Sequence, residues 1–429
     1  MRQAMRGRHR AGHRFTVVLL WTSIASSVQA GNGINPIGFG AESVSVAGAD
    51  IATTRDSNAL NINPAALAIM TGHQFDVDYN FLHATPISHA DANGASHDSD
   101  MRYVRILTGG YVQHLNNIPM TIGIGVFAQA GAGADFTGMQ TVFGTRDQVR
   151  NLIRVASLNT GLGYTVSDTL SVGMSLVMMY ADAEQDVLPN TSVAAPFFGY
   201  QLRDVSDTAL GFNLGLRYQI GKQNIVGVAY KSPVEFTLDG GYLVSNQTAL
   251  GLGNVTYRSV TIEGIRQPQE LGIGIQHTLQ DNFNLAAELN WVNWSNAFTS
   301  STLTASNPDT PGAPAVLSQT GASNWRDQII IALGFSYEVS SALTWRAGAN
   351  YGRNPIPNES LSPLLAPVTE YNIATGISYQ HSQQSKFDAV LEYSIPNEQT
   401  YTNPNSPLGP NTSTTTAVIG VHLAYSMKW

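Results

Sequence analysis

The chain has 429 residues, and only 12% of them are charged, about half the share found in ordinary soluble proteins. Cysteine is absent, which excludes a disulfide scaffold and a thiolate metal site. The formal net charge of −8 makes the chain a poor partner for nucleic acid. Few charges combined with a mean hydropathy of −0.06 are expected where alternate strand residues face lipid and a polar interior.

The first 30 residues have the organisation of a secretory signal peptide. Five arginines precede an apolar run at residues 15–24, which is too short to span a bilayer. Residues 28–30 end in a small-x-small pattern, so we expect cleavage after Ala30, which would remove five positive charges and leave a net charge of −13. A basic arm for nucleic acid is the alternative, but it does not explain the apolar run.

Residues 31–72 are rich in Gly, Ala, Ser and Asn, too polar for a membrane span and too poor in charge for a solvated tail. Pro64 fixes a turn and disfavours the helical conformation at Asn63. If the remaining chain closes into a barrel, we expect this stretch to lie inside the barrel lumen. We therefore expect a plug, or hatch, whose gate turn is Asn63, Pro64 and Ala65. An ordinary helix-capping loop before residues 65–70 is the alternative, and both can hold.

From residue 73 onward, apolar and polar residues alternate with the period of a β-strand. The last strand shows this most clearly, with an apolar face made by Ala417, Ile419, Val421, Leu423, Tyr425, Met427 and Trp429. The same period recurs at residues 170–180, 210–218, 283–291, 329–337 and 343–351. No later segment has 18 uninterrupted apolar residues, so spanning helices are excluded. A membrane protein without such helices must close its strands into a barrel.

Short and long connections alternate along the barrel region. The short ones lie at 166–168, 221–223, 280–282 and 339–341, and we expect long loops at roughly 183–206, 238–264, 297–323, 353–368 and 396–413. This alternation is typical of outer-membrane barrels with short periplasmic turns and long outer loops. We predict an all-β, transmembrane antiparallel barrel of about fourteen strands over residues 73–429, with the plug and the C-terminus on the periplasmic side.

Two local features of the barrel region bear on function. Residues 127–135 of the third strand contain Gly131 and Gly133, and strand glycines mark a bulge or bend, although a normally paired strand of small residues is equally compatible. The long loops carry apolar residues that would be costly in water unless they docked or received a ligand. The candidates for ligand binding are Leu188, Phe197, Phe198, Tyr200, Tyr242 and Leu243. Packing of the loops on one another is the alternative.

Charged residues on inward strand positions are expected to pair inside the lumen. They are Arg217, Glu288, Arg326, Arg346 and Glu392, with Glu42, Arg55 and Asp56 of the plug as partners. Histidines and aspartates at residues 83–98 form a weak candidate metal site, but scattered loop histidines are ordinarily solvated. We expect no metal and no cofactor. Serines and histidines are too dispersed to predict a catalytic triad, so we expect no enzyme.

Several stretches resemble one family when their order and spacing are taken together. They are residues 47–49 followed by 56–65, then 268–274, 291–295, 324–326, 333–337, 346–348 and 354–357. These resemble the FadL-type outer-membrane transporters of long-chain fatty acids and their TodX-like relatives, which admit aromatic hydrocarbons. The resemblance covers residues 31–429; Trp429 departs from the phenylalanine more usual at the barrel end, and residues 91–100 have no counterpart.

The resemblance implies a mechanism as well as a fold. In the family, an inward kink of the third strand opens a gap in the wall through which an apolar ligand leaves sideways, and Gly131 and Gly133 are where such a kink is expected. The apolar loops resemble the family's outer capture groove. We therefore expect a monomer that moves hydrophobic molecules, above all long-chain fatty acids, passively into outer-membrane lipid. The loops would capture the ligand, a pocket in the lumen would bind it, and a movement at the plug and the third strand would release it. Uptake of aromatic hydrocarbons, a hydrophilic porin, a barrel lipase and an adhesin are the alternatives.

Overall fold

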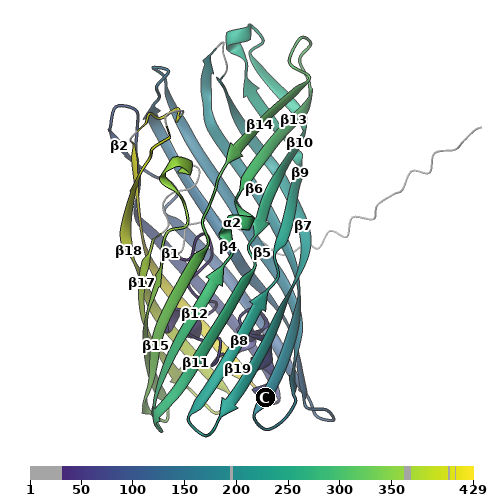
Figure 1. Ribbon diagram of the computed structural model, residues 1–429, viewed down its shortest axis with the longest axis vertical. Helices are drawn as coiled ribbons and strands as arrows, with labels where there is room; N and C mark the ends of the chain where they lie inside the picture. Colours follow the sequence, from purple (N-terminus) through teal and green to yellow (C-terminus); the bar gives the residue numbers. More distant parts are fainter. Residues whose placement is uncertain (1–30, 194–196, 362–368, 404–405, 411) are drawn as a thin grey trace, which may run out of the picture.

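The computed structural model describes residues 31–429 except 194–196, 362–368, 404–405 and 411. The predicted signal peptide, residues 1–30, lies outside the described residues. The strands form one antiparallel sheet that closes on itself, because β1 (His73–Ala90) pairs on one side with β3 (Tyr103–Leu115) and on the other with β19 (Ser413–Lys428) (Figure 1). In the described part of the chain, no helix is long and apolar enough to cross a membrane.

The other elements follow in chain order. The remaining strands are β2 (Ser96–Asp98), β4 (Met120–Gln140), β5 (Arg146–Thr165), β6 (Leu170–Val193), β7 (Phe197–Ile220), β8 (Asn224–Lys231), β9 (Val234–Asn246), β10 (Asn254–Gln267), β11 (Glu270–Gln280), β12 (Phe283–Val292), β13 (Ser300–Pro308), β14 (Val316–Ala322), β15 (Gln328–Ser340), β16 (Leu343–Gly352), β17 (Tyr371–Gln380) and β18 (Ser385–Thr400). The helical turns are α1 (Ala41–Ser45), η1 (Ser57–Leu60), η2 (Pro64–Ile69), η3 (Thr248–Leu250), α2 (Trp294–Ala297) and η4 (Asn358–Ser360).

These segments make the closed barrel of 14 strands that the alternating pattern predicts. Some barrel strands are interrupted, as the partners of β7 show: it pairs with β8 along one half of its length and with β9 along the other. Likewise β11 pairs with β8, and β10 pairs with β9. The predicted alternation of faces is confirmed on β6, where Leu176 is 53% exposed and Ser175 is fully buried.

Short turns gather at one end of the barrel and long connections at the other (Figure 1). We call these the turn end and the loop end. The predicted short connections are confirmed, and the long connections predicted at 183–206, 238–264 and 297–323 contain strands as well as turns. These regions are mostly β-hairpins that lengthen the wall, since β6 pairs with β7 as far as Val193 and Phe197. A register shift between Val187 and Ser192 absorbs Pro189, so this proline does not end the strand.

Candidate functional site

The N-terminal segment, residues 31–72, lies inside the barrel nearer its turn end (Figure 1). Strand β1 begins directly after it, at His73. Ala41, Leu60, Ala65 and Leu67 are fully buried against the wall and against one another. We call residues 31–72 the inner segment. Because it fills space that the barrel would otherwise enclose, every element around it must leave room for it.

Asn63, Pro64 and Ala65 form a turn that is fixed from both sides. The Asn63 side chain accepts a hydrogen bond from the Ala65 N–H at 3.1 Å and caps η2, with Pro64 at its first position. Its amide nitrogen donates to the carbonyl of Ile51 at 2.8 Å and to the carbonyl of Leu216, in strand β7, at 3.1 Å. One asparagine therefore ties the turn to the inner segment and to the wall.

Inward-facing glycines of the wall make space for this turn. A Cβ atom on Gly173 of β6 would lie 2.2 Å from the carbonyl carbon of Pro64, and one on Gly215 of β7 would lie 2.1 Å from the Asn63 side-chain oxygen. Gly348 of β16 approaches the backbone of Val46 in the same way, at 2.3 Å. Glycine at inward-facing strand positions therefore indicates, already in the sequence, that a segment packs closely against the inside of the wall.

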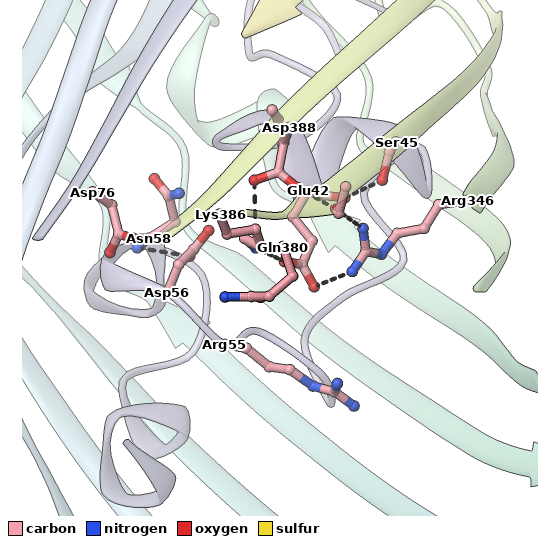
Figure 2. Close-up of polar contacts among 12 residues, drawn as sticks. Glu42, Ser45, Arg55, Asp56, Asn58, Asp76, Arg346, Gln380, Lys386 and Asp388 are labelled. Carbon is pink, nitrogen blue, oxygen red and sulfur yellow. Dashed lines mark hydrogen bonds and ion pairs between the residues drawn. The ribbon is translucent and has the colours of Figure 1, made fainter. Parts of the chain in front are cut away.

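Glu42 holds the inner segment to the wall through two cations. Its carboxylate contacts Arg346 of β16 at 3.1 Å and Lys386 of β18 at 2.6 Å, as Figure 2 shows. Lys386 also contacts Asp388 at 3.4 Å, and Arg346 donates to Ser378. Burial opposes ionisation of Glu42, but the neighbouring cations outweigh it and hold the pKa of Glu42 well below its usual range.

Other buried acids lie in the inner segment or beside it, and no cation offsets their burial as Arg346 and Lys386 do for Glu42. The Glu288 carboxylate of β12 accepts hydrogen bonds from the backbone N–H groups of Asp50 and Ile51, at 2.9 and 2.8 Å. Burial raises the pKa of Asp50 to about 7, and the charge of Glu42 adds to this. Burial together with Asp76 and Asp78 of β1 also raises the pKa of Asp56. Asp50 and Asp56 therefore keep their protons to a higher pH than an exposed aspartate does.

The remaining predicted lumen charges divide into two groups. Arg217 faces inward on β7, and its Nε has no hydrogen-bond partner among the described residues. Arg326 does not join the inner charges, because its side chain is 63% exposed and contacts Glu359 of η4 at 3.7 Å. The expectation that Arg326 pairs with the plug is therefore wrong; the chain is irregular between β14 and β15, so the strand alternation does not extend to this residue.

The wall is open between β3 and β4. Their ladder runs from Leu115 and Met120 to Gly109 and Val126 and then ends, although both strands continue toward the loop end. Strand β4 keeps its pairing with β5 but shifts register between Ala128 and Ala130. Beyond that shift, the Gly131 N–H donates to the carbonyl of Ile34 in the inner segment, at 3.1 Å. The bulge therefore lies beside the predicted glycines, and β4 turns its free edge toward the lumen.

A cavity lies behind this opening. It has an empty volume of about 570 Å³, part of it open to solvent. Its apolar walls include Leu82 of β1, Ile106 of β3, Phe127 and Ala128 of β4 and Val418 of β19. Its polar end is formed by Asn80, Glu392 and His422. We call it the gap cavity. Of these three, sequence reasoning named only Glu392; the inward polar face of the last strand was the signal for His422.

A second cavity of about 720 Å³ lies between the inner segment and β8, β11 and β12. Its titratable lining residues are Asp50, Lys231, Glu270 and Glu288. Lys231 contacts Glu270 at 3.0 Å and lies 4.9 Å above the ring of Phe39. We call it the lumen cavity. Both cavities therefore border the inner segment, and the lysine that lines the lumen cavity is already paired with an acid.

The predicted ligand-binding residues do not form one exposed surface. They are Leu188, Phe197, Phe198, Tyr200, Tyr242 and Leu243. Leu188 is fully buried in an apolar cluster with Phe136 of β4, and Phe197 packs against that cluster. Leu243 belongs to a second cluster, against which Tyr200 packs, while Tyr242 is exposed.

The weak candidate metal site lies in the loop between β1 and β3. There, Asp91 accepts a hydrogen bond from His97 at 2.8 Å and from three backbone N–H groups.

Comparison with known families matches almost the whole chain. The model of a family described as "Outer membrane protein transport protein (OMPP1/FadL/TodX)" matches residues 21–428. A long-chain fatty acid transport protein of Salmonella typhi is 24% identical over 62% of this chain. That alignment spans 66% of the relative's own length. Outer membrane protein P1 of Haemophilus influenzae is 22% identical, with 79% of this chain and 81% of that protein covered.

Solved structures share the fold. The Pseudomonas putida toluene transporter TodX superposes with a TM-score of 0.75 at 17% identity, covering 92% of this chain and 99% of that one. The Ralstonia pickettii toluene transporter TbuX gives a TM-score of 0.72 at 19% identity, with the same two coverages. At these identities the likeness establishes the architecture alone.

The close approach at Gly173 predicts a strong effect from a single methyl group. Gly173→Ala places a Cβ against the backbone of Pro64, so we expect overpacking to cost about 1–3 kcal/mol of unfolding free energy. Displacement of the turn should also raise ion conductance in planar bilayers. Gly321→Ala is the matched control, since a Cβ there meets nothing within 4 Å. Equal stability and conductance for the two variants would contradict this packing.

The raised pKa of Asp50 predicts a pH dependence. Between its ordinary value of 3.8 and about 7, the folded state keeps a proton that the unfolded state releases, so this residue lowers stability as pH rises. Asp50→Asn removes that contribution. We expect denaturant unfolding of the variant to depend less on pH across this window than unfolding of the parent protein. Asp281→Asn, at an exposed turn, should leave the dependence unchanged; an unchanged dependence in Asp50→Asn would refute the assignment.

Proposed function

The chain belongs to the outer membrane protein transport family (OMPP1/FadL/TodX), and on that basis we propose that it carries hydrophobic molecules passively across the outer membrane. The observation that supports this most is the parting of β3 and β4 with a mainly apolar cavity behind it. A hydrophobic molecule gains free energy on moving from water to such a cavity and then to lipid. No catalytic step and no cofactor are part of this proposal.

The proposed route begins at the loop end. The apolar residues of β6, β7 and β9 lie there mostly in buried clusters, and Tyr242 is an exposed residue of the predicted set at which an oily molecule can first bind. The molecule then reaches the gap cavity and leaves sideways between β3 and β4. Gly131 and Gly133 contribute by allowing β4 to bend toward the inner segment, where the Gly131 N–H donates to the carbonyl of Ile34.

The inner segment has the role of a plug in this proposal. It occupies the lumen and lines part of both cavities, and the contacts of Glu42 and Asn63 hold it there. With short turns toward the periplasm, the plug blocks the direct aqueous path while the lateral opening stays available. A hydrophilic porin would instead need an unobstructed polar lumen. Since one chain closes its own barrel, we propose that it acts as a monomer in contact with outer-membrane lipid.

Two classes of cargo fit this route. Long-chain fatty acids are the expectation from sequence, and the Salmonella typhi relative is named for their transport. Aromatic hydrocarbons are the alternative, and the solved structures with this fold include toluene transporters. Both classes need an apolar path with an exit to lipid, so the route itself is tested before the cargo.

Closing the opening tests the proposed route. Ala128→Trp places an indole in the gap cavity, so we expect several-fold slower uptake of a labelled hydrophobic compound by cells that carry the variant. Ion conductance of the purified protein should stay unchanged, because the inner segment is untouched. Thr160→Trp, on the exposed face of β5, is the control. Undiminished uptake by correctly inserted Ala128→Trp would exclude this exit.

A further inference from the structure

The polar end of the gap cavity holds an acid and an imidazole that neutralise each other. The Nε2 of His422 lies 2.8 Å from the Oε2 of Glu392, and its Nδ1 lies 2.7 Å from the Oδ1 of Asn80. Both members of the pair are buried, with side chains 5% exposed. None of the described residues that line the cavity is a lysine or an arginine. The cavity therefore contains hydrogen-bonding groups but no free positive charge.

The lumen cavity excludes anions for a similar reason. Its one lining cation among the described residues, Lys231, is already paired with Glu270. Asp50 and Glu288 add two further acids to the lining, so acids outnumber cations there. A carboxylate entering this cavity would lose its hydration and find no unpaired lysine or arginine among the described lining residues.

The other inner cations, Arg55 of the inner segment among them, line neither cavity. Arg346 and Lys386 are engaged by Glu42. Arg217 has an unpartnered Nε, but it lies past Gly215 and Leu216, which contact the Asn63 turn. It lines neither cavity. The plug therefore separates this arginine from the proposed path.

We propose that the molecule passing through the gap cavity is uncharged: a hydrophobic compound with at most one small hydrogen-bonding group, such as a hydroxyl or an ester carbonyl. This rests on the proposed function and narrows its substrate class. Glu392, His422 and Asn80 can donate to or accept from a neutral group that reaches the end of the cavity. An ionised fatty-acid headgroup would be buried there without a counter-charge, which costs far more than burying a hydrogen-bonded hydroxyl.

Two compounds with the same ten-carbon chain distinguish an uncharged cargo from an ionised fatty acid. We would measure binding of labelled 1-decanol and labelled decanoate to the full chain in lipid nanodiscs, well above the pKa of the acid. Empty nanodiscs supply the partition background. Uptake of both compounds would be followed in cells with and without the protein. We expect the alcohol to bind about tenfold more tightly than the carboxylate or better, once partitioning is subtracted.

A single substitution tests whether Glu392 sets this preference. Glu392→Gln keeps the side chain's size but removes the acid, so the imidazole of His422 no longer faces a carboxylate of the protein. We expect the alcohol-to-carboxylate preference to fall about tenfold in this variant. Glu235→Gln is the control, because Glu235 is exposed on β9 and paired with Arg266, away from both cavities. A ratio of two affinities is measured on folded protein alone, so partial misfolding does not imitate the effect.

The outcomes distinguish the inference from the function on which it rests. Protein-dependent uptake of decanoate with equal or tighter binding than decanol would overturn the neutral-cargo inference and leave transport intact. An unchanged preference in Glu392→Gln would overturn the role of Glu392. Absence of protein-dependent uptake for both compounds would overturn the transport proposal itself, and the inference with it.

Discussion

A barrel of this width encloses more space than the side chains of its own wall fill, and the contents of that space determine the rest of the structure. Here the contents are residues 31–72, whose own backbone groups must be satisfied without water. Asn63 does this for the turn that it caps, and Glu288 does it for the N–H groups of Asp50 and Ile51. Wall glycines such as Gly173 then allow the two backbones to meet.

Filling the lumen also determines where its charges lie. A buried ion needs a partner, and Glu42 has two, one from each of two different strands. The same requirement leaves the cavities beside the inner segment with paired or neutral groups instead of free cations. In the proposed account, the parting of β3 and β4 gives uncharged molecules an exit, while the inner segment occupies the lumen. Selection by charge and exit by the side would then have one physical origin.

Sequence periodicity predicted the parts of this structure that local rules control. Alternation predicted the strands, their outward faces and the 14-stranded closure, because lipid and lumen impose a period of two on each strand. The alternation gave wrong strand ends where a strand contains a residue, such as proline, that usually ends a strand. Pro189 was taken as a loop residue, yet the sheet accommodates it in a bulge. Arg326 was placed in the lumen by extending the alternation through a segment that is irregular.

The candidate site was harder to predict because it depends on contacts between distant segments. Glycines in the third strand indicated a bend, but no local signal shows that β3 and β4 stop pairing at Gly109 and Val126. The group of Asn80, Glu392 and His422 is assembled from β1, β18 and β19, which meet only when the barrel closes. Leu188 and Leu243 were correctly identified as unusual apolar residues, but their separate clusters depend on tertiary packing.

The central claim is that cargo leaves through the wall while the inner segment stays in place. Since the chain has no cysteine, one engineered pair, Ile51→Cys with Gly274→Cys, can tether that segment, because a Cβ on Gly274 lies 3.2 Å from the Ile51 Cβ. The decisive measurement is the uptake rate of labelled decanol by this variant before and after oxidation. The account predicts equal rates with the tether formed. Loss of uptake on oxidation and recovery on reduction would show that the segment must move aside, and would contradict it.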